Sequence, residues 1–293
     1  MKVLITGSNG QLARDLIDNS PENFDIHPMT RSELDITDAK KVNNVIDRVK
    51  PDIVINTAAY TAVDECEINK DTAWEVNCTG TGNLVSAIIN SDTKLVHYST
   101  DYVFGGSANR PYRVDDETRP LSVYGKSKLA GEKLIREKLN KENAIIIRSG
   151  WIYSAHSTNF FKKIMQLMKS RPAISVINDQ TGTPTWSKSL ALASWKLIAK
   201  GNDRIIYHYS DGGYCTWYDF AVQIYKELVN RKIINHKVDI TPVSSKEFNA
   251  LAQRPHYSVL DSQLLQDEIE YIPDSWEVSL NKMLDLYPEL ASS

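Results

Sequence analysis

Two residues four positions apart, Tyr124 and Lys128, are suited to acid–base chemistry. On a helix such residues share one face, with Cβ atoms about 5–6 Å apart. A tyrosine hydroxyl ordinarily has a pKa near 10, and a neighbouring ammonium would favour the phenolate and lower that pKa. The pair could then transfer a proton near neutral pH, as a general acid–base catalyst does. The same spacing occurs in ordinary amphipathic helices, so its meaning depends on the elements that position it.

The start of the chain has the pattern of a strand, a glycine turn and a helix. Residues 2–6 are apolar and largely β-branched, which is typical of a buried parallel strand. Gly7 would permit a tight turn, and Gly10 would let the backbone approach a diphosphate. The helix that begins at Gln11 and Leu12 would offer free N–H groups and a favourable dipole to that anion. The segment therefore predicts a dinucleotide site.

Strand-like runs and helical patterns alternate through the first half of the chain. The strands are expected at residues 3–6, 24–29, 52–58, 95–99 and 144–148, and the helices at 11–19, 38–49, 72–91 and 124–140. This alternation predicts an α/β protein with a Rossmann-type, doubly wound parallel sheet and right-handed crossovers. Its ligand crevice should lie at the carboxyl ends of the strands.

After about residue 150 the pattern loosens and aromatic residues become frequent. We therefore expect an NAD(P)-binding domain over residues 1–150 and a smaller, mixed α/β lobe, mainly substrate-binding, over 151–293. Further strands are expected at 174–177 and 205–209. Some elements around 174–210 should return to the first domain or border it.

Composition narrows the function classes. The chain has 293 residues, a formal net charge of −3 and a pI near 6.1, which argues against a nucleic-acid-binding surface. Apolar runs stay well short of the roughly 20 residues of a membrane helix. Met1 leads almost directly into a strand, which leaves no room for a signal peptide. Cys66, Cys78 and Cys215 lack C-x-x-C spacing, so we expect reduced thiols in a cytoplasmic protein.

The ends of the expected strands carry residues that could bind a cofactor and a carbonyl. Arg31 follows the second strand and could meet a 2′-phosphate, which favours NADPH over NADH, or could be a loop arginine facing solvent. Ala58 and Ala59 follow the third strand and would let a cofactor lie against the backbone. Thr100 ends the fourth strand, where its hydroxyl could bind a substrate carbonyl together with Tyr124 or simply form a turn.

Several longer motifs, in order along nearly the whole chain, resemble the extended short-chain dehydrogenase/reductase superfamily. Within it, the chain is most similar to the dTDP-4-dehydrorhamnose reductase family. The superfamily features are the glycine turn, Asn77 and the Tyr124/Lys128 pair. The narrower matches are the segments Asn56–Asp64, His97–Phe104, Val123–Glu132, Arg148–Tyr153, Asn159–Phe160, Val176–Gln180 and Arg254–Pro255.

This resemblance implies an oxidoreductase that reduces the C4 ketone of dTDP-4-dehydro-L-rhamnose to dTDP-L-rhamnose with NADPH or NADH, the last step of dTDP-rhamnose biosynthesis for cell-surface polysaccharide. The implied catalytic residues are Thr100, Tyr124 and Lys128. The implied cofactor-binding residues are Gly7, Gly10, Gln11, Leu12, Arg31, Asp35, Ile36, Ala58, Ala59, Tyr60, Tyr124 and Lys128. Thr100, Asp101, Tyr124 and Trp151 would meet the substrate, and Arg254 would contact its diphosphate, because a guanidinium fork suits phosphate.

One departure from the family pattern concerns metal binding and oligomeric state. The resemblance implies magnesium-dependent dimers with acidic residues at the interface. Asp15 offers one such carboxylate, but Lys188 stands where another acidic residue would be expected. A cation would be repelled by that lysine, so we predict no metal requirement and either a monomer or a homodimer.

Three other functions stay open. Asp101 beside Thr100 allows a nucleotide-sugar dehydratase or epimerase that recycles tightly held NAD. A non-catalytic regulatory subunit, similar to the beta subunit of methionine adenosyltransferase, would share the fold, although intact Thr100, Tyr124 and Lys128 argue against it. A reductase for a different dTDP-4-keto-6-deoxy sugar would have the same motifs, since the stereochemical outcome depends on how the sugar ring sits.

Overall fold

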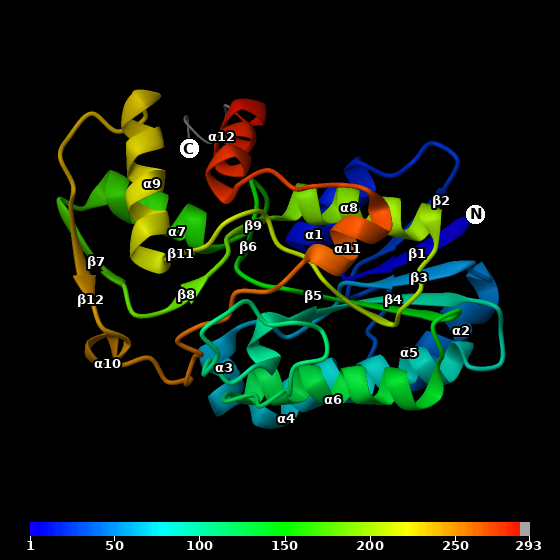
Figure 1. Ribbon diagram of the computed structural model, residues 1–293. Helices are drawn as coiled ribbons and strands as arrows, with labels where there is room; N and C mark the ends of the chain where they lie inside the picture. The colour runs from blue at the N-terminus through cyan, green and yellow to red at the C-terminus, as the bar shows by residue number, and fades with distance from the viewer. Residues whose placement is uncertain (288–293) are drawn as a thin grey trace.

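A six-stranded parallel sheet forms the centre of the protein in a computed structural model that describes residues 1–287 (Figure 1). The strand order is β10-β5-β4-β3-β1-β2, and every neighbouring pair is parallel. The order reverses between β1 and β3, which is where a doubly wound sheet opens a ligand crevice. The predicted Rossmann-type fold is confirmed. The strands are β1 (Lys2–Thr6), β2 (Asp25–Met29), β3 (Ile53–Asn56), β4 (Lys94–Thr100), β5 (Ala144–Ser149) and β10 (Ile206–His208).

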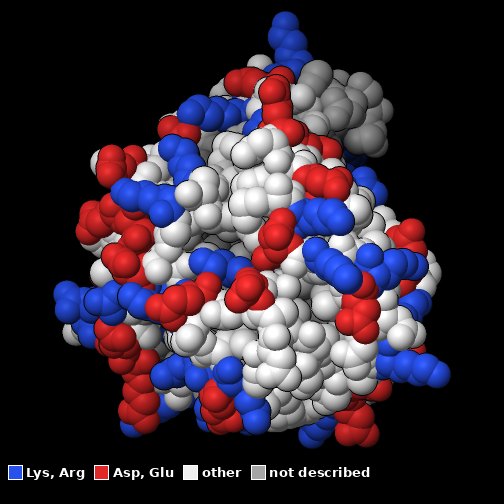
Figure 2. Space-filling view, turned by 90° about the vertical axis from the view of Figure 1, so that its right-hand side faces the viewer, with Lys and Arg blue, Asp and Glu red and all other residues white. Residues whose placement is uncertain are grey.

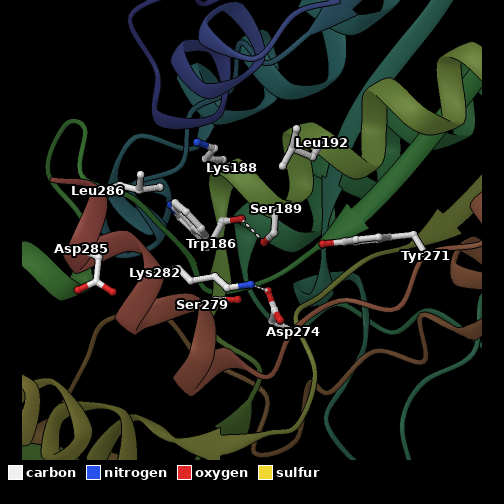
Figure 3. A pocket seen from close by; sticks show the side chains of 10 residues that line it. All are labelled: Trp186, Lys188, Ser189, Leu192, Tyr271, Asp274, Ser279, Lys282, Asp285 and Leu286. Carbon is white, nitrogen blue, oxygen red and sulfur yellow. Dashed lines mark hydrogen bonds and ion pairs between the residues drawn. The ribbon is translucent and has the colours of Figure 1, made fainter.

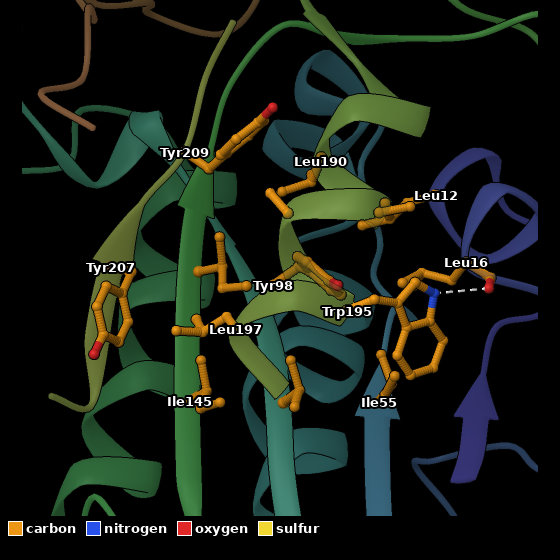
Figure 4. Close-up of a cluster of buried hydrophobic side chains, with 14 of the residues drawn as sticks. Leu12, Leu16, Ile55, Tyr98, Ile145, Leu190, Trp195, Leu197, Tyr207 and Tyr209 are labelled. Atoms are coloured by element: carbon orange, nitrogen blue, oxygen red, sulfur yellow. Dashed lines mark hydrogen bonds between the residues drawn. The ribbon is translucent and has the colours of Figure 1, made fainter. Parts of the chain in front are cut away.

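Helices cover both faces of the sheet because its strands are apolar on both sides. In β1, Val3 and Ile5 join one buried core while Leu4 joins another. The first core lies under α1 (Gln11–Asp18), α8 (Ser187–Lys200) and α11 (Gln263–Ile269), and the second under α2 (Ala39–Val49), α5 (Thr81–Ile88) and α6 (Val123–Lys138). Figure 4 shows the first core, where Trp195 Nε1 donates to the Leu16 carbonyl at 3.0 Å.

The helix expected at 72–91 is interrupted by a π-helical turn. It consists of α4 (Lys70–Trp74), the turn η1 (Glu75–Gly80) and α5, and is preceded by α3 (Val63–Ile68). Asn77 in the turn accepts from Tyr60 N at 2.8 Å and donates to Ser127 Oγ at 3.0 Å. The turn thereby fixes the loop after β3 to α6, in keeping with the frequent occurrence of π-turns at functional sites.

The C-terminal elements build a third core beside the sheet (Figure 1). Of the two later strands expected, only the one near 205–209 enters the main sheet, as β10. The other, β7, pairs with β12 in a separate two-stranded sheet. The elements outside the main sheet are β6 (Ile152–Tyr153), α7 (Phe160–Ser170), β7 (Ala173–Ile177), β8 (Thr181–Gly182), β9 (Thr185–Trp186), β11 (Cys215–Thr216), α9 (Trp217–Asn230), β12 (Asp239–Val243), α10 (Ser245–Phe248) and α12 (Trp276–Leu286).

Surface charge and the cysteines bear on the class of protein. Acidic and basic side chains are interspersed on the face seen in Figure 2. Within residues 1–287, no helix is both long and apolar enough to cross a membrane. Cys66, Cys78 and Cys215 are free thiols, and burial raises the pKa of each.

Candidate active site

A cavity of about 810 Å³ opens at the carboxyl ends of β1, β3, β4 and β5. Its volume is in the range of small-molecule sites. The fold brings most of the predicted site residues to its wall, from segments far apart in sequence. They are Gly7, Gly10, Gln11, Leu12, Ala58, Ala59, Thr100, Asp101, Tyr124, Lys128, Trp151 and Arg254.

The glycine turn leaves room for a ligand against the backbone. Gly7 has φ +66°, and a Cβ there would lie 2.9 Å from Ala58 Cα. Gly10 is the N-cap of α1 and supplies no side-chain cap, so the first N–H groups of the helix are available to an anion. The Gln11 side-chain oxygen accepts from Ser154 and Asn159 at 2.9 Å each, which ties α1 to the loop before α7.

Tyr124 lies in the first turn of α6, in the cavity wall. Ser122 is the N-cap of this helix and accepts from Gly125 N at 3.1 Å, which fixes where the helix begins. The Tyr124 hydroxyl lies within hydrogen-bonding reach of the Thr100 side chain. Burial raises the pKa of the Tyr124 hydroxyl well above its ordinary value.

Lys128 is directed towards β4. Its Nζ donates to the Tyr98 carbonyl at 2.6 Å and lies 3.3 Å from His97 Nε2. Burial lowers the pKa of Lys128 to about 8. The prediction that Lys128 lowers the pKa of Tyr124 is therefore wrong for this arrangement, because burial dominates at Tyr124. The phenol stays protonated near neutral pH, which is the state that a proton donor needs.

The hydrogen bonds of Asn56 and His97, which lie next to Lys128, indicate that His97 is neutral. Thr6 Oγ1 and Ala58 N donate to Asn56 Oδ1, at 2.7 and 3.2 Å, so Asn56 presents its Nδ2 to His97 Nδ1 at 3.1 Å. Nδ1 then accepts, and the one proton of a neutral imidazole is on Nε2, which faces Lys128. Burial lowers the pKa of His97 well below its ordinary value.

Thr100 and Asp101 form a buried pair at the end of β4, where the short helix η2 (Asp101–Val103) begins. Thr100 Oγ1 accepts from Tyr102 N at 3.1 Å and donates to Asp101 Oδ1 at 3.0 Å. The hydroxyl proton is thus engaged with Asp101, which differs from the expectation that Thr100 donates to a substrate carbonyl. Burial raises the pKa of Asp101 to about 6. Gly150 makes room for this carboxyl, since a Cβ there would lie 2.5 Å from Asp101 Cγ.

Arg254 reaches the cavity from the C-terminal half of the chain. Both of its terminal nitrogens bind the Asp64 carboxylate, at 2.7 and 3.1 Å, and Asp64 also accepts from Ala252 N at 2.9 Å. The fork that was predicted to meet a diphosphate is thus held by a carboxylate on α3. This ion pair fixes the segment after α10 to α3.

Four predicted cofactor residues lie outside the set that lines the cavity. Arg31 Nε pairs with Asp35 at 3.2 Å, and the Arg31 side chain is 74% exposed. Ile36 is buried in the core under α2, and the Tyr60 hydroxyl donates to Glu65 at 3.0 Å. Their contacts with the adenosine end of a cofactor stay predictions.

Some residues of the cavity wall were assigned no role from the sequence. They include Asn159, Phe160, Lys163 and Trp217. Asn159 and Phe160 lie within a family motif, which was a usable signal. Lys163 and Trp217 follow no spacing rule and reach the cavity only through the packing of α7 and α9.

One oxygen of Asp15, the carboxylate that the family resemblance would place near a metal, is engaged in a hydrogen bond. Asp15 is buried and accepts from the Ser187 hydroxyl, and burial raises its pKa. Lys188 Nζ lies 5.8 Å from the centre of the Trp186 ring. Within residues 1–287, no three His, Cys, Asp or Glu side chains are grouped to hold a metal ion.

A second cavity, of about 430 Å³, lies between α8 and α12 (Figure 3). Its polar side chains are largely engaged with each other. Lys282 Nζ binds Asp274 at 2.5 Å, and Ser189 Oγ donates to the Trp186 carbonyl at 2.8 Å. This cavity is separate from the residues predicted to do chemistry.

Comparison with known proteins finds relatives along nearly the whole chain. A chain that is 35% identical, a dTDP-4-dehydrorhamnose reductase from Aggregatibacter actinomycetemcomitans, aligns over 96% of this chain and 98% of its own length. A dTDP-4-keto-6-deoxy-D-glucose reductase from Streptomyces niveus is 35% identical over 88% of this chain and 87% of its own. The crystal structure of a dTDP-4-dehydrorhamnose reductase from Bacillus anthracis, in complex with NADP, superposes with a TM-score of 0.91. It is 37% identical and covers 97% of this chain and 99% of the crystallised one.

The family described as the RmlD substrate binding domain matches residues 1–288. That range contains the glycine turn, the Tyr124 and Lys128 pair and the aromatic wall of the cavity. The chain therefore belongs to the RmlD family, that of the dTDP-4-dehydrorhamnose reductases.

Proposed function

We propose that the protein reduces the C4 ketone of dTDP-4-dehydro-L-rhamnose to the alcohol, using NADPH as the reductant. The observation that carries the proposal is the meeting of Tyr124 and Thr100 in one cavity, whose wall also contains the glycine turn and Trp151. Tyr124 would be the proton donor, the glycine turn would hold the anionic cofactor and Trp151 would meet the sugar. Full-length similarity to dTDP-4-dehydrorhamnose reductases supports the same substrate.

The cradle at the N-terminus of α1 suits a dinucleotide. The turn at Gly7 admits no side chain, and Gly10 leaves the first N–H groups of the helix uncapped. A diphosphate would be held there by backbone donors and the helix dipole. Ala58 and Ala59 would hold the middle of the cofactor. When bound, the reduced nicotinamide supplies the hydride for the ketone carbon.

Tyr124 would give its proton to the ketone oxygen as negative charge develops there. Burial keeps the phenol protonated, and transfer to an alkoxide remains favourable because an alkoxide is the stronger base. Thr100, whose side chain lies within hydrogen-bonding reach of the Tyr124 hydroxyl, would hold that hydroxyl in place. Lys128 would fix β4 to α6 and bind the ribose next to the nicotinamide.

The test is the oxidation of NADPH by purified protein with enzymatically prepared dTDP-4-dehydro-L-rhamnose. We expect stoichiometric formation of dTDP-L-rhamnose. Protein that binds NADPH but leaves it unoxidised with this ketone would overturn the proposal.

A second candidate is reduction of a different dTDP-4-keto-6-deoxy sugar, which the similarity to the Streptomyces niveus reductase favours. Assay of dTDP-4-keto-6-deoxy-D-glucose beside dTDP-4-dehydro-L-rhamnose separates the two candidates by kcat/KM. We expect the higher value for the rhamnose precursor.

The preference for NADPH rests on Arg31. Its exposed guanidinium lies just after β2 and pairs with the partly exposed Asp35, so it is accessible to a 2′-phosphate. The NADP complex of the Bacillus anthracis relative supports this choice. Arg31→Ala should raise the KM for NADPH severalfold and leave the KM for NADH unchanged. Equal effects on the two cofactors would contradict the assignment.

A further inference from the structure

Trp151 has an unusual backbone for a large aromatic residue. Its φ is +50°, a left-handed conformation that residues with a side chain seldom adopt and that costs free energy unless the surroundings enforce it. The residue directly follows Gly150, which touches the Asp101 carboxyl. Its carbonyl accepts from Thr185 N at 3.2 Å. The segment therefore links the reaction centre to the lobe that carries α9.

Two residues outside this segment enclose the Trp151 indole. A Cβ on Gly182 would lie 2.4 Å from Trp151 Cε2 and 2.6 Å from Nε1, so the indole occupies the space that any side chain at position 182 would need. The Trp217 ring stacks on Trp151 with a centroid distance of 3.4 Å and an interplanar angle of 5°. Both indoles line the cavity.

Trp217 is itself held rigidly. It is the first residue of α9, whose start is fixed by a capping box: Thr216 Oγ1 accepts from Asp219 N at 3.1 Å, and Asp219 accepts from Thr216 N at 3.0 Å. Phe160 packs on Trp217 at 4.4 Å and on Phe220 at 5.6 Å. A column of aromatic rings thus runs from the cavity wall into the buried core of the second lobe.

We propose that Trp217 and Gly182 are positioning residues that hold the Trp151 indole as a preformed wall against the dTDP-sugar. The inference rests on the proposed function for the identity of the ligand, but the stack itself does not. A ligand that meets a wall already in place loses less conformational entropy on binding than one that must order it. Trp217 acts through Trp151, so its removal should cost nothing further once Trp151 is absent.

The stack can be observed without any ligand. Two parallel indoles in contact couple their strong transitions, so we expect a pair of circular dichroism bands of opposite sign in the far ultraviolet from the wild type. Trp217→Leu and Trp151→Ala should each abolish the pair of bands, and the control Trp74→Phe, at a distant and partly exposed position on α4, should keep it. A wild-type spectrum without the coupled bands would overturn the proposal.

Binding of dTDP-glucose, a stable dTDP-hexose, then measures the effect by calorimetry. Trp217→Leu should raise its Kd between about twofold and tenfold, the range expected for loss of an aromatic pair. Trp217→Phe should recover part of that loss, and the Kd for NADPH should stay unchanged. Gly182→Ala should also raise the Kd for dTDP-glucose although Trp217 is intact.

A double-mutant cycle separates positioning from direct contact. In the Trp151→Ala background, Trp217→Leu should leave the Kd for dTDP-glucose unchanged. Additive losses would mean that Trp217 meets the ligand itself and would overturn the positioning role. Failure of the wild type to oxidise NADPH with the ketone would count against the proposed function alone, because the spectra and the Kd comparison need no turnover.

Discussion

At the scale of single residues, burial shifts the pKa values of the site more than ion pairing does. Burial raises the pKa of the Tyr124 hydroxyl and lowers that of the Lys128 ammonium. Both shifts favour the neutral forms, so a neutral phenol lies near a lysine that loses its proton easily. A phenol in this state gives up its proton only to a strong base, such as the alkoxide that forms during ketone reduction.

Tyr124→Phe should therefore remove most turnover and leave cofactor binding intact. A positioned acid contributes roughly 10²–10⁴ in rate, so we expect a fall in kcat of that order. Steady-state kinetics and NADPH titration measure the two properties. Tyr214→Phe, at an exposed position, is the matched control and should behave like the wild type. A Tyr124→Phe enzyme with more than about a tenth of wild-type activity would remove Tyr124 from the acid role.

The sequence predicts which residues line the cavity better than it predicts their hydrogen-bond and ion-pair partners there. The spacing of Tyr124 and Lys128 and the glycine turn are local patterns, and both lie at the cavity wall. The orientation of the Lys128 side chain depends on its contact with His97. The orientation of the Arg254 guanidinium depends on Asp64, 190 positions away in the chain. Such pairings arise from packing between elements, which no local spacing encodes.

At the scale of elements, close backbone contacts set the position of α6. A Cβ at Gly125 would lie 2.2 Å from the Tyr102 carbonyl oxygen, and one at Gly131 would lie 2.5 Å from the Asn77 carbonyl oxygen. The helix therefore packs directly against η2 and η1 at two glycines. Tyr124 is placed by the first of these contacts, because it is the residue next to Gly125.

Gly125→Ala should destabilise the protein and reduce kcat together. The added methyl group meets backbone that cannot turn aside, and overpacking of this kind costs about 1–3 kcal/mol. The control is Gly82→Ala in α5, where the nearest atom is the end of the Leu134 side chain at 3.1 Å and alanine favours the helix. Thermal unfolding and kinetics of the two variants make the comparison. Equal behaviour of both variants would show that the contact with Tyr102 does not position α6.

Element boundaries were predicted well where periodicity was regular and less well where it was broken. The strand expected at 24–29 is β2, at Asp25–Met29, and the helix expected at 38–49 is α2, at Ala39–Val49. The helix expected at 72–91 is interrupted by the π-turn η1, which was not predicted. The turn is held by contacts of Asn77 with Tyr60 and Ser127, and these depend on the packing of α6 and of the loop after β3. Placing β7 in its own sheet with β12 required a partner more than 60 residues away.

At the scale of the whole molecule, one buried carboxyl joins two of the cores. Asp211 follows β10, accepts from Trp186 N at 3.0 Å and binds the hydroxyl of Ser189 on α8. Trp186 belongs to the third core, that of the C-terminal elements, and α8 packs in the first. Burial raises the pKa of Asp211 to about 7, so the native state holds this proton more tightly than the unfolded chain does.

Stability should consequently depend on pH through Asp211. A carboxyl with a raised native pKa contributes stability that is complete below its unfolded pKa, near 3.8, and is lost as pH rises through about 7. Asp211→Asn cannot ionise, so its Tm relative to the wild type should increase from pH 5 to pH 8. The exposed Asp267→Asn should show no such trend. Scanning fluorimetry at both pH values measures the Tm of each variant. A difference in Tm between Asp211→Asn and the wild type that does not change with pH would contradict the role of Asp211.

The position of β10 at the edge of the sheet has a consequence for synthesis on the ribosome. Residues 150–205 must be made before Ile206–His208 can pair with β5. Until then the run Ala144–Ser149, with three consecutive isoleucines, forms an open edge that can recruit another chain. In the folded protein the two edge strands pair less readily with another chain, because β2 contains Pro28 and β10 has only three residues. The nascent chain is therefore most prone to aggregate between the completion of β5 and the arrival of β10.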